Sequence, residues 1–304
     1  PGWTAVAAAV TPSVVSIIAG NDEGSGVVWD DAGHVVTNNH VISAVGVGGT
    51  VKVMVSDQRT FNAKVIGADP TTDLAVLQIE NAPDGLLPLV HTAQTLHVGD
   101  SVMAIGNPLG LSGTVTTGIV SALDRPVATA SSKSTPVVTD AIQTSAPINP
   151  GNSGGALVND QGVLVGINSS IASLDTSSSG QPGSIGIGFA IPLNEVNVIV
   201  PQLIQSGTAQ HAYLGITTTD ASVATGGSEL GGAGVTTVVG DGPSNQQLQR
   251  GDLITAVNGA PTPSSEALLG QVRTLPIGQS VILTVYRNGV QQSVTVTLGR
   301  SPLT

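Results

Sequence analysis

Residues 150–155 read Pro150-Gly151-Asn152-Ser153-Gly154-Gly155, a serine enclosed by glycines. A serine that attacks a carbonyl must sit on a turn that exposes its oxygen, with backbone N–H groups nearby to bind the developing oxyanion. Glycines on both sides allow the backbone to make such a turn and to approach a substrate closely. The alternative is a glycine-rich hairpin turn in which the serine is incidental. Ser153 is therefore a candidate nucleophile.

A histidine and an aspartate upstream of this stretch extend the pattern. The segment Thr37–Ile42 places His40 directly after a strand-like run, and histidine is the usual general base near neutral pH. Asp73 stands immediately before an apolar run, where a buried carboxylate can orient an imidazole; a solvated turn aspartate is the commoner alternative. The chain order His40, Asp73, Ser153 matches the chymotrypsin order and differs from the subtilisin and α/β-hydrolase orders.

Short strand-like runs surround these residues in two blocks, and the many Gly (39) and Pro (18) residues punctuate the turns between them. Both blocks suit small antiparallel barrels. The first block contains Ser13–Ala19, Ser25–Trp29, His34–Thr37, Val51–Val55, Ala63–Asp69 and Leu74–Ile79. The second contains Ser101–Ile105, Thr114–Leu123, Ala156–Val158, Val163–Ser169 and Gly188–Ile191. Loops are expected at Pro126–Pro136 and Ser173–Ser184.

The C-terminal part of the chain begins a new pattern. Apolar residues recur at helical spacing over Leu193–Ser206, and Gly207 is a natural stop. From Tyr213 onward the strand-like pattern restarts, and an amphipathic helix fits Ser264–Leu275. The expected strands are Leu214–Thr218, Gly234–Val239, Leu253–Val257, Val281–Arg287 and Ser293–Leu298. This mix predicts a second, β-rich domain.

Composition limits the function classes. The 304 residues favour two domains, because one core rarely grows that large. Acidic residues number 20 against 9 Lys plus Arg, so nucleic-acid binding is not expected. The chain has no Cys, which excludes thiolate catalysis and Cys-ligated zinc. The sequence contains no phosphate loop and no His-x-x-x-His pair, so no cofactor and no metal are expected.

The N-terminal region carries no membrane span of its own. The uncharged stretch Ala5–Asn21 is interrupted by Pro12 and is too short to cross a bilayer comfortably. It also lacks the basic region of a signal peptide. Because the chain begins at Pro1 without Met, we expect an upstream segment, where a membrane anchor or signal would lie.

Five motifs together resemble the HtrA/DegP serine proteases, and the glycine- and valine-rich features are similar to the actinobacterial branch. They are Thr37–Ile42, Thr72–Leu77, Ala104–Gly110, Thr114–Arg125 and Ile148–Leu157. The resemblance implies a mainly β chain in which a chymotrypsin-like double β-barrel precedes a PDZ domain. It implies a serine protease domain over residues 1–195, a linker helix over 196–208 and the PDZ domain over 209–304.

The resemblance also implies roles for individual residues. Ser153 would attack the scissile carbonyl, His40 would take its proton and pass it to the leaving amine, and Asp73 would orient His40. The N–H groups of Gly151 and Ser153 would form the oxyanion hole, with Asn152 between them.

The expected substrate pocket follows from the same likeness. Pro147, six positions before Ser153, often marks the pocket base in this fold, and no acid stands there. Ile187, Gly188 and Phe189 resemble the pocket wall, so small to medium aliphatic P1 residues are expected. The chain departs from the family at Ser145, where Asp is commoner, and at Pro147, usually Ala; both put the supporting contacts of this loop in question.

The stretch Tyr213-Leu214-Gly215-Ile216 resembles the carboxylate-binding loop of HtrA PDZ domains. Consecutive N–H groups can hold a C-terminal carboxylate while the peptide adds a strand beside them. Leu248–Ile254 resembles the core turn of the same domain, although Gln247 stands where Gly is usual. The alternative is a β-rich module that stabilises the first domain and binds nothing.

These features favour an ATP-independent serine endopeptidase that degrades unfolded proteins in envelope quality control, in the periplasm or outside the cell, regulated by peptides at the PDZ domain. The alternatives are a holding chaperone or peptide-binding scaffold with low proteolysis, and an esterase, which the absence of Gly-x-Ser-x-Gly disfavours. The resemblance implies unfolded or C-terminal peptide partners, activation-sensing loops at 126–136 and 173–184, and homotrimers. Trp3 is a candidate trimer contact; an exposed, disordered terminus is the alternative.

Overall fold

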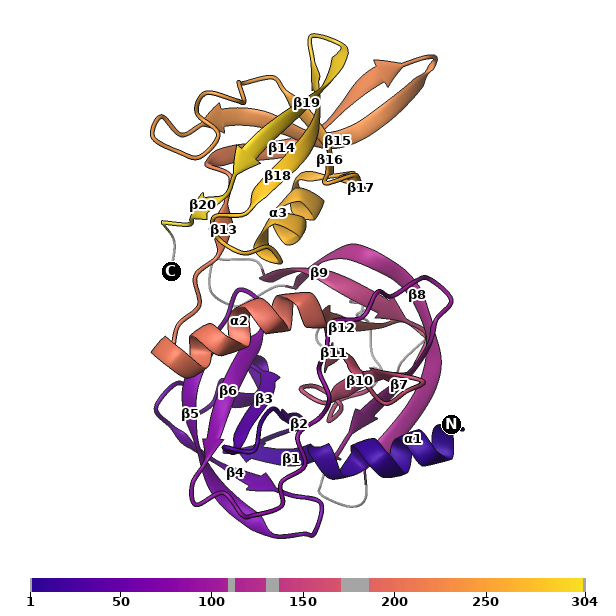
Figure 1. The fold of residues 1–304 in the computed structure, drawn as a ribbon, viewed down its shortest axis with the longest axis vertical. Coiled ribbons are helices and arrows are strands. Elements are labelled where there is room, and N and C mark those ends of the chain that lie inside the picture. The colour runs from indigo at the N-terminus through magenta and orange to yellow at the C-terminus, as the bar shows by residue number, and fades with distance from the viewer. Residues whose placement is uncertain (1, 109–112, 130–136, 171–185, 303–304) are drawn as a thin grey trace. The chain divides into compact units, whose positions relative to one another are not determined.

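The computed structural model describes residues 2–108, 113–129, 137–170 and 186–302 (Figure 1). The chain divides into two compact units. The second unit contains residues 210–304 together with the short pieces 126–128 and 138–140, and the first contains the remainder.

The first unit contains two closed six-stranded barrels, as the sequence analysis predicts for a chymotrypsin-like fold. The first barrel has the strand order β1-β2-β3-β6-β5-β4. Its strands are β1 (Val14–Ala19), β2 (Asp22–Val28), β3 (His34–Asn38), β4 (Thr50–Met54), β5 (Thr60–Asp69) and β6 (Leu74–Ile79). Its interior is aliphatic and dominated by valine, because the branched side chains of Val and Ile pack well on a pleated, buried face.

The second barrel has the strand order β10-β11-β12-β9-β8-β7. Its strands are β7 (Ser101–Gly106), β8 (Thr114–Thr129), β9 (Val137–Thr144), β10 (Ala156–Asn159), β11 (Leu164–Ser169) and β12 (Gly188–Pro192). The prediction of a loop beginning at Pro126 is wrong, because β8 continues to Thr129. Strand β9 neighbours β8 in the sheet, and this pairing outweighs the loop-like local composition. The other predicted loop, Ser173–Ser184, lies outside the described residues.

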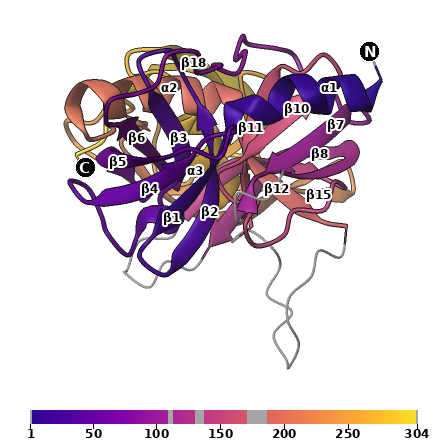
Figure 2. The ribbon, with the colours of Figure 1, turned by 90° about the horizontal axis from the view of Figure 1, so that it is seen from below.

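The described part of the first unit contains two α-helices, α1 and α2 (Figure 2), and two short 3-10 helices, Thr11–Ser13 and His40–Ile42. Helix α1 (Trp3–Val10) was not predicted; it buries Val6 and Val10, and the half-buried Trp3 packs against the same core cluster. Trp3 is therefore not part of an exposed terminus. Helix α2 (Leu193–Ser206) has the bounds predicted from its apolar spacing, begins before residue 196, where the linker helix was expected to start, and contacts β5 and β6 of the same unit. It ends at Gly207, whose φ of 76° is left-handed. No described helix is long and apolar enough to cross a membrane.

The described part of the second unit contains a six-stranded sheet, a two-stranded sheet and one α-helix. The main strand order is β14-β15-β16-β18-β19, with β17 paired to β16 and β13 paired to β20. The elements are β13 (Ala212–Tyr213), β14 (Ile216–Thr225), β15 (Ser228–Val238), β16 (Leu253–Val257), β17 (Ala260–Pro261), α3 (Ser265–Arg273), β18 (Ser280–Arg287), β19 (Val290–Thr297) and β20 (Gly299–Arg300). Strands β14 and β15 are longer than predicted, because Gly226 and Gly227, both with positive φ, turn them into one long hairpin.

Candidate active site

His40 and Asp73 meet at one end of the first barrel. Strand β3 ends at Asn38 and pairs with the start of β6 at Leu74, so the residues that follow and precede these positions face each other. The Nδ1 atom of His40 lies 2.8 Å from Oδ2 of Asp73, and the backbone N–H of His40 donates to Oδ1 at 2.9 Å. Both carboxylate oxygens therefore face one histidine, and the position of its ring is determined.

Asp73 itself is held by its backbone. It adopts a left-handed conformation with φ of 58°, which aspartate tolerates better than most residues. In this conformation its carbonyl accepts the N–H of Asn39 at 3.0 Å and the side-chain amide of Asn38 at 3.1 Å. The hydroxyl of Ser169, at the end of β11, donates to Oδ2 at 3.3 Å. The carboxylate is thus oriented from both barrels.

Ser153 lies on the turn that leads into β10. Gly151 and Gly154 flank it with φ of 94° and 82°, conformations that other residues rarely adopt. The backbone is tightly placed, since a Cβ on Gly151 would approach Cβ of Pro108 to 2.6 Å. Asn152, between the two proposed oxyanion donors, is buried and donates its N–H to the Asn149 carbonyl at 3.0 Å.

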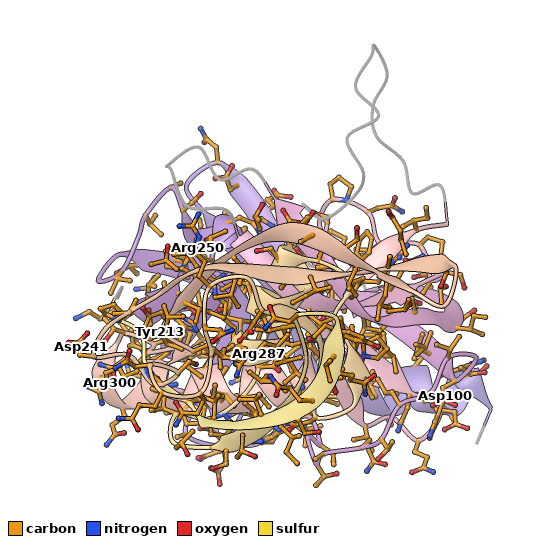
Figure 3. All side chains as sticks on the ribbon, turned by 90° about the horizontal axis from the view of Figure 1, so that it is seen from above. Asp100, Tyr213, Asp241, Arg250, Arg287 and Arg300 are labelled. Carbon is orange, nitrogen blue, oxygen red and sulfur yellow. The ribbon has the colours of Figure 1, made fainter. Side chains whose placement is uncertain are left out.

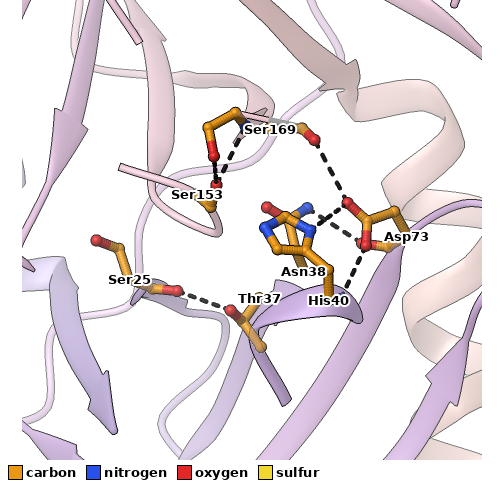
Figure 4. A network of polar contacts seen from close by, with 8 residues as sticks. Ser25, Thr37, Asn38, His40, Asp73, Ser153 and Ser169 are labelled. Atoms are coloured by element: carbon orange, nitrogen blue, oxygen red, sulfur yellow. Dashed lines mark hydrogen bonds and ion pairs between the residues drawn. The ribbon is translucent and has the colours of Figure 1, made fainter. Parts of the chain in front are cut away.

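The side chains of the three predicted catalytic residues lie close together. Figure 4 shows the ring of His40 between Asp73 and Ser153. The hydroxyl of Ser153 nevertheless has other partners, because its oxygen accepts the backbone N–H of Ser170 at 3.1 Å and lies 2.5 Å from the Ser170 hydroxyl. Among the described residues, His40 makes no hydrogen bond to Ser153.

Three residues of this network were missed by the sequence analysis: Ser25, Ser169 and Ser170. Ser25 joins β2 to the turn at Ser153, since its N–H donates to the Ser153 carbonyl at 2.8 Å. Its Gly24-Ser25-Gly26 context repeats the glycine-flanked pattern that identified Ser153, so the sequence held an indication of it. Ser169 and Ser170 carry no such indication, because only the barrel closure brings them to the site.

The two predicted walls of the substrate pocket lie on neighbouring strands. Gly188 pairs with Thr144 and Phe189 with Gln143, so Ile187, Gly188 and Phe189 run beside the strand that leads to Pro147. Gly188 also allows close packing there, because a Cβ would come within 3.0 Å of the Ala146 carbonyl.

The two departures from the family pattern have supporting contacts. Ser145 accepts the N–H of Ile119 through its hydroxyl at 3.0 Å and donates its own N–H to the Ile119 carbonyl at 3.1 Å. The carbonyl of Pro147 accepts the hydroxyl of Thr116 at 2.7 Å. Strand β8 therefore holds this loop even though Ser145 is shorter than aspartate.

In the second unit, Tyr213-Leu214-Gly215-Ile216 connects β13 to β14. Gly215 has φ of 77°, and its carbonyl accepts the N–H of Val239 at 2.8 Å. Within the described part of the chain, no hydrogen bond uses the N–H groups of Leu214 and Gly215. Strand β14 has β15 on one side only, so its other edge is open to a further strand. These are the requirements for binding the end of an extended peptide.

A pocket of about 500 Å³ lies beside Tyr213. Asp241 and Arg300 contribute the charged side chains of its lining, and both lie near Tyr213 in Figure 3. No group of three metal-ligating His, Asp or Glu side chains occurs among the residues that the structure describes.

Two protein-family models match this chain, one for each unit. A model of the trypsin-like peptidase domain matches residues 24–167, and a model of the PDZ domain matches residues 212–298. The first match contains His40, Asp73 and Ser153, and the second contains the segment Tyr213–Ile216.

Curated relatives and solved structures match most of the chain. Serine protease PepD of Mycobacterium tuberculosis is 44% identical over 97% of this chain and 66% of its own length. Periplasmic serine endoprotease DegP of Escherichia coli is 42% identical over 91% of this chain and 57% of its own. The chain thus spans less than two thirds of these relatives. The structure of the HtrA-type protease AlgW with a tripeptide is 32% identical, with a TM-score of 0.70, and covers 100% of this chain and 99% of that one. The same protease with a decapeptide is 30% identical, with a TM-score of 0.66 and full coverage of both chains.

Proposed function

The chain belongs to the HtrA/DegP family of serine proteases, and we propose that it is an endopeptidase that degrades unfolded proteins in the cell envelope. We further propose that peptides bound by its PDZ domain regulate cleavage. The observation that carries the catalytic proposal is the double contact of Asp73 with His40, at 2.8 and 2.9 Å, beside the Ser153 turn.

The geometry supports a defined proton path. Because Nδ1 of His40 faces the Asp73 carboxylate, that nitrogen carries the proton and Nε2 is left as the acceptor. Nε2 takes the hydroxyl proton of Ser153 as its oxygen attacks the substrate carbonyl, and later gives the proton to the leaving amine. Asp73 stabilises the imidazolium that forms between these steps. Water then repeats the sequence to release the acyl group.

The tetrahedral intermediate needs donors for its oxyanion. The N–H groups of Gly151 and Ser153 are the proposed donors, on a turn whose backbone conformation only glycine adopts readily. Loss of one such donor typically reduces the rate by about 100- to 1000-fold.

In the structure the Ser153 hydroxyl is directed to Ser170, whereas the proposed mechanism needs it directed to His40. For attack, the Ser153 hydroxyl must leave Ser170, 2.5 Å away, and turn towards His40. We infer that substrate or a regulatory peptide favours this rearrangement.

Peptide recognition is proposed at Tyr213–Ile216 and along the open edge of β14. The N–H groups of Leu214 and Gly215, which have no hydrogen-bond acceptor among the described residues, support the capture of a C-terminal carboxylate. The AlgW structures contain peptides, and the likeness of that chain to this one supports peptide binding by the present protein.

The setting of the activity is proposed from relatives. DegP relatives carry names that place them in the periplasm, which supports an envelope location. Homotrimers assembled near the N-terminal segment remain our expectation for the family, with Trp3 of α1 as a candidate contact. Its half-buried position still leaves part of the indole exposed. Sedimentation velocity on the wild type and on Trp3→Ala tests this expectation.

The catalytic proposal is tested with unfolded casein and a fluorophosphonate probe. The wild type should cleave casein and be labelled covalently, whereas Ser153→Ala should do neither. Ser206→Ala, which changes an exposed serine on α2, is the matched control. Equal casein loss in the wild type and Ser153→Ala would disprove the mechanism. Suppression of aggregation without any cleavage by the wild type would favour the holding-chaperone alternative.

The regulatory proposal needs a separate experiment. Peptides ending in a free carboxylate should bind the full chain and raise the rate of casein cleavage. The same peptides with an amidated C-terminus should bind more weakly, because the carboxylate is what the loop N–H groups recognise. Binding without any change in rate would leave the PDZ domain a docking module and remove its regulatory role.

A further inference from the structure

We propose that Ser25 is a positioning residue for the oxyanion hole, acting through the main chain of the turn that carries Ser153. This inference rests on the proposed function and adds a residue from the other barrel to its machinery. Ser25 lies on β2 and is completely buried. It touches neither substrate nor reacting atoms, so its effect must pass through the backbone.

All three polar groups of Ser25 are used at this junction, in four hydrogen bonds. Its N–H donates to the Ser153 carbonyl at 2.8 Å, and its hydroxyl donates to the Gly151 carbonyl at 2.6 Å. The hydroxyl oxygen also accepts the N–H of Asn107 at 2.8 Å. The Ser25 carbonyl accepts the hydroxyl of Thr37 at 2.7 Å. One serine thus links β2 and β3 of the first barrel to the nucleophile turn of the second.

Two of these contacts enclose the proposed oxyanion donor. The peptide unit is planar, so holding the Gly151 carbonyl also directs the N–H of Asn152, which donates to Asn149 at 3.0 Å. Holding the Ser153 carbonyl likewise directs the N–H of Gly154, which donates to the Asn168 carbonyl at 2.9 Å. The peptide unit between these two carries the Ser153 N–H. Its orientation is therefore constrained from both sides.

Close approach of the two backbones depends on glycines. A Cβ on Gly24 would lie 2.7 Å from a methyl group of Val41 and 3.3 Å from the Ser153 carbonyl oxygen. A Cβ on Gly154 would lie 2.1 Å from the Ser25 carbonyl oxygen. The strand and the turn therefore approach each other closely at glycines, and the Ser25 hydroxyl bonds the Gly151 carbonyl there.

The test separates positioning from folding. In Ser25→Ala the Gly151 carbonyl loses its donor and can rotate, which should lower kcat about 10- to 100-fold. The KM for a peptide substrate should change less than about twofold, because the oxyanion forms only in the transition state. Affinity for a peptide aldehyde, whose adduct places an oxyanion in the hole, should fall by the same factor as kcat. A purely structural role would lower the melting temperature without this matched loss.

Two further variants complete the design. Ser25→Cys keeps about the same side-chain volume and a weaker hydrogen-bond donor, so its kcat should lie between those of the wild type and Ser25→Ala. If the alanine variant folds poorly, a kcat of Ser25→Cys below that of the wild type still tests the positioning role. Ser16→Ala is the matched control, since Ser16 pairs directly with Ser25 across β1 and β2. Its buried hydroxyl has no partner among the described residues, so kcat should not change.

The outcomes distinguish this inference from the proposed function. No Ser153-dependent cleavage by the wild type would overturn the proposed function and this inference with it. An active wild type with unchanged kcat and aldehyde affinity in folded Ser25→Ala would overturn the positioning role alone. A rise in KM at constant kcat would also overturn it.

Discussion

The hydroxyl of Ser153 lies 2.5 Å from the hydroxyl of Ser170, and its oxygen accepts the Ser170 N–H at 3.1 Å. The hydroxyl of the proposed nucleophile is therefore held by the residue that follows β11, while His40 is held by Asp73. Under the proposed mechanism, activation requires the Ser153 hydroxyl to exchange its hydrogen bond with Ser170 for one with His40. Through this contact, the orientation of the Ser153 hydroxyl depends on the residue that follows β11.

Removal of the Ser170 hydroxyl should make the resting enzyme more reactive. In Ser170→Ala only the backbone N–H still competes for the Ser153 oxygen, so the hydroxyl turns to His40 more often. We expect the rate of fluorophosphonate labelling without added peptide to rise about threefold to tenfold, which corresponds to roughly 0.7–1.4 kcal/mol for one hydrogen bond. Ser206→Ala should label at the wild-type rate. Unchanged labelling of Ser170→Ala would show that the Ser170 hydroxyl does not restrain the nucleophile.

Replacement of Asp73 tests the orientation of His40. Asp73→Asn keeps the size of the side chain but no longer favours the tautomer with its proton on Nδ1, so kcat should fall about 10,000-fold. Steady-state cleavage of a fluorogenic peptide measures this. Asp57→Asn serves as the control: Asp57 is exposed, and although its hydrogen bond from Arg59 lowers its pKa, the pair lies outside the site. A loss of less than about tenfold in Asp73→Asn would contradict the assigned role.

A methyl group on Gly151 should disable the oxyanion turn. In Gly151→Ala the new Cβ meets Pro108 at 2.6 Å, and the φ of 94° is itself unfavourable for alanine. The turn must shift, and we expect kcat to fall about 100- to 1000-fold. Gly46→Ala introduces alanine at another left-handed position, with φ of 67° and no atom within 4 Å of the new Cβ. It should cost stability but leave kcat near that of the wild type.

Substrate preference is testable with peptides that differ only at P1. The predicted pocket base, Pro147, and the predicted wall, residues 187–189, carry no acid, so Val, Ala or Leu should be preferred to Arg or Lys. We expect kcat/KM to differ by at least about tenfold, since a cation in an apolar pocket is left unpaired. Equal or faster cleavage after Arg would contradict the predicted pocket.

The PDZ unit should depend on an ion pair between the buried Asp252 and the partly exposed Arg287. Two guanidinium nitrogens of Arg287 contact Asp252 at 2.7 and 2.8 Å, and this hydrogen bonding raises the pKa of Arg287, so its charge persists. Asp252 is fully buried. Arg287→Ala leaves its carboxylate without a cation and should cost roughly 3 kcal/mol in the free energy of unfolding. Arg250→Ala, at an exposed arginine, should change it by less than about 0.5 kcal/mol in the same denaturant titration.

The spacing of apolar residues along the sequence was sufficient to predict most of the helices and strands. Helix α2 has its predicted bounds, and β6 and β16 match residue for residue, because each displays its apolar pattern within its own sequence. Sequence patterning did not predict β9, since this strand follows a Ser/Thr-rich segment and owes its place to β8 and β12. It also missed α1, whose Val6 and Val10 reveal their burial only once the barrels form.

For the site, sequence motifs by themselves predicted His40, Asp73 and Ser153 as catalytic residues, because the chemistry requires these residue types in glycine-rich or strand-edge contexts, and the structure brings the three side chains together. The motifs could not show that the Ser153 hydroxyl contacts the Ser170 hydroxyl. They also could not show that the Ser25 hydroxyl donates to the carbonyl of Gly151, which is 126 residues away in the sequence. Such contacts depend on how two closed barrels meet. A hydrogen bond of 2.6 Å between segments so distant in sequence leaves no periodic trace, so only the tertiary structure decided how the nucleophile is held.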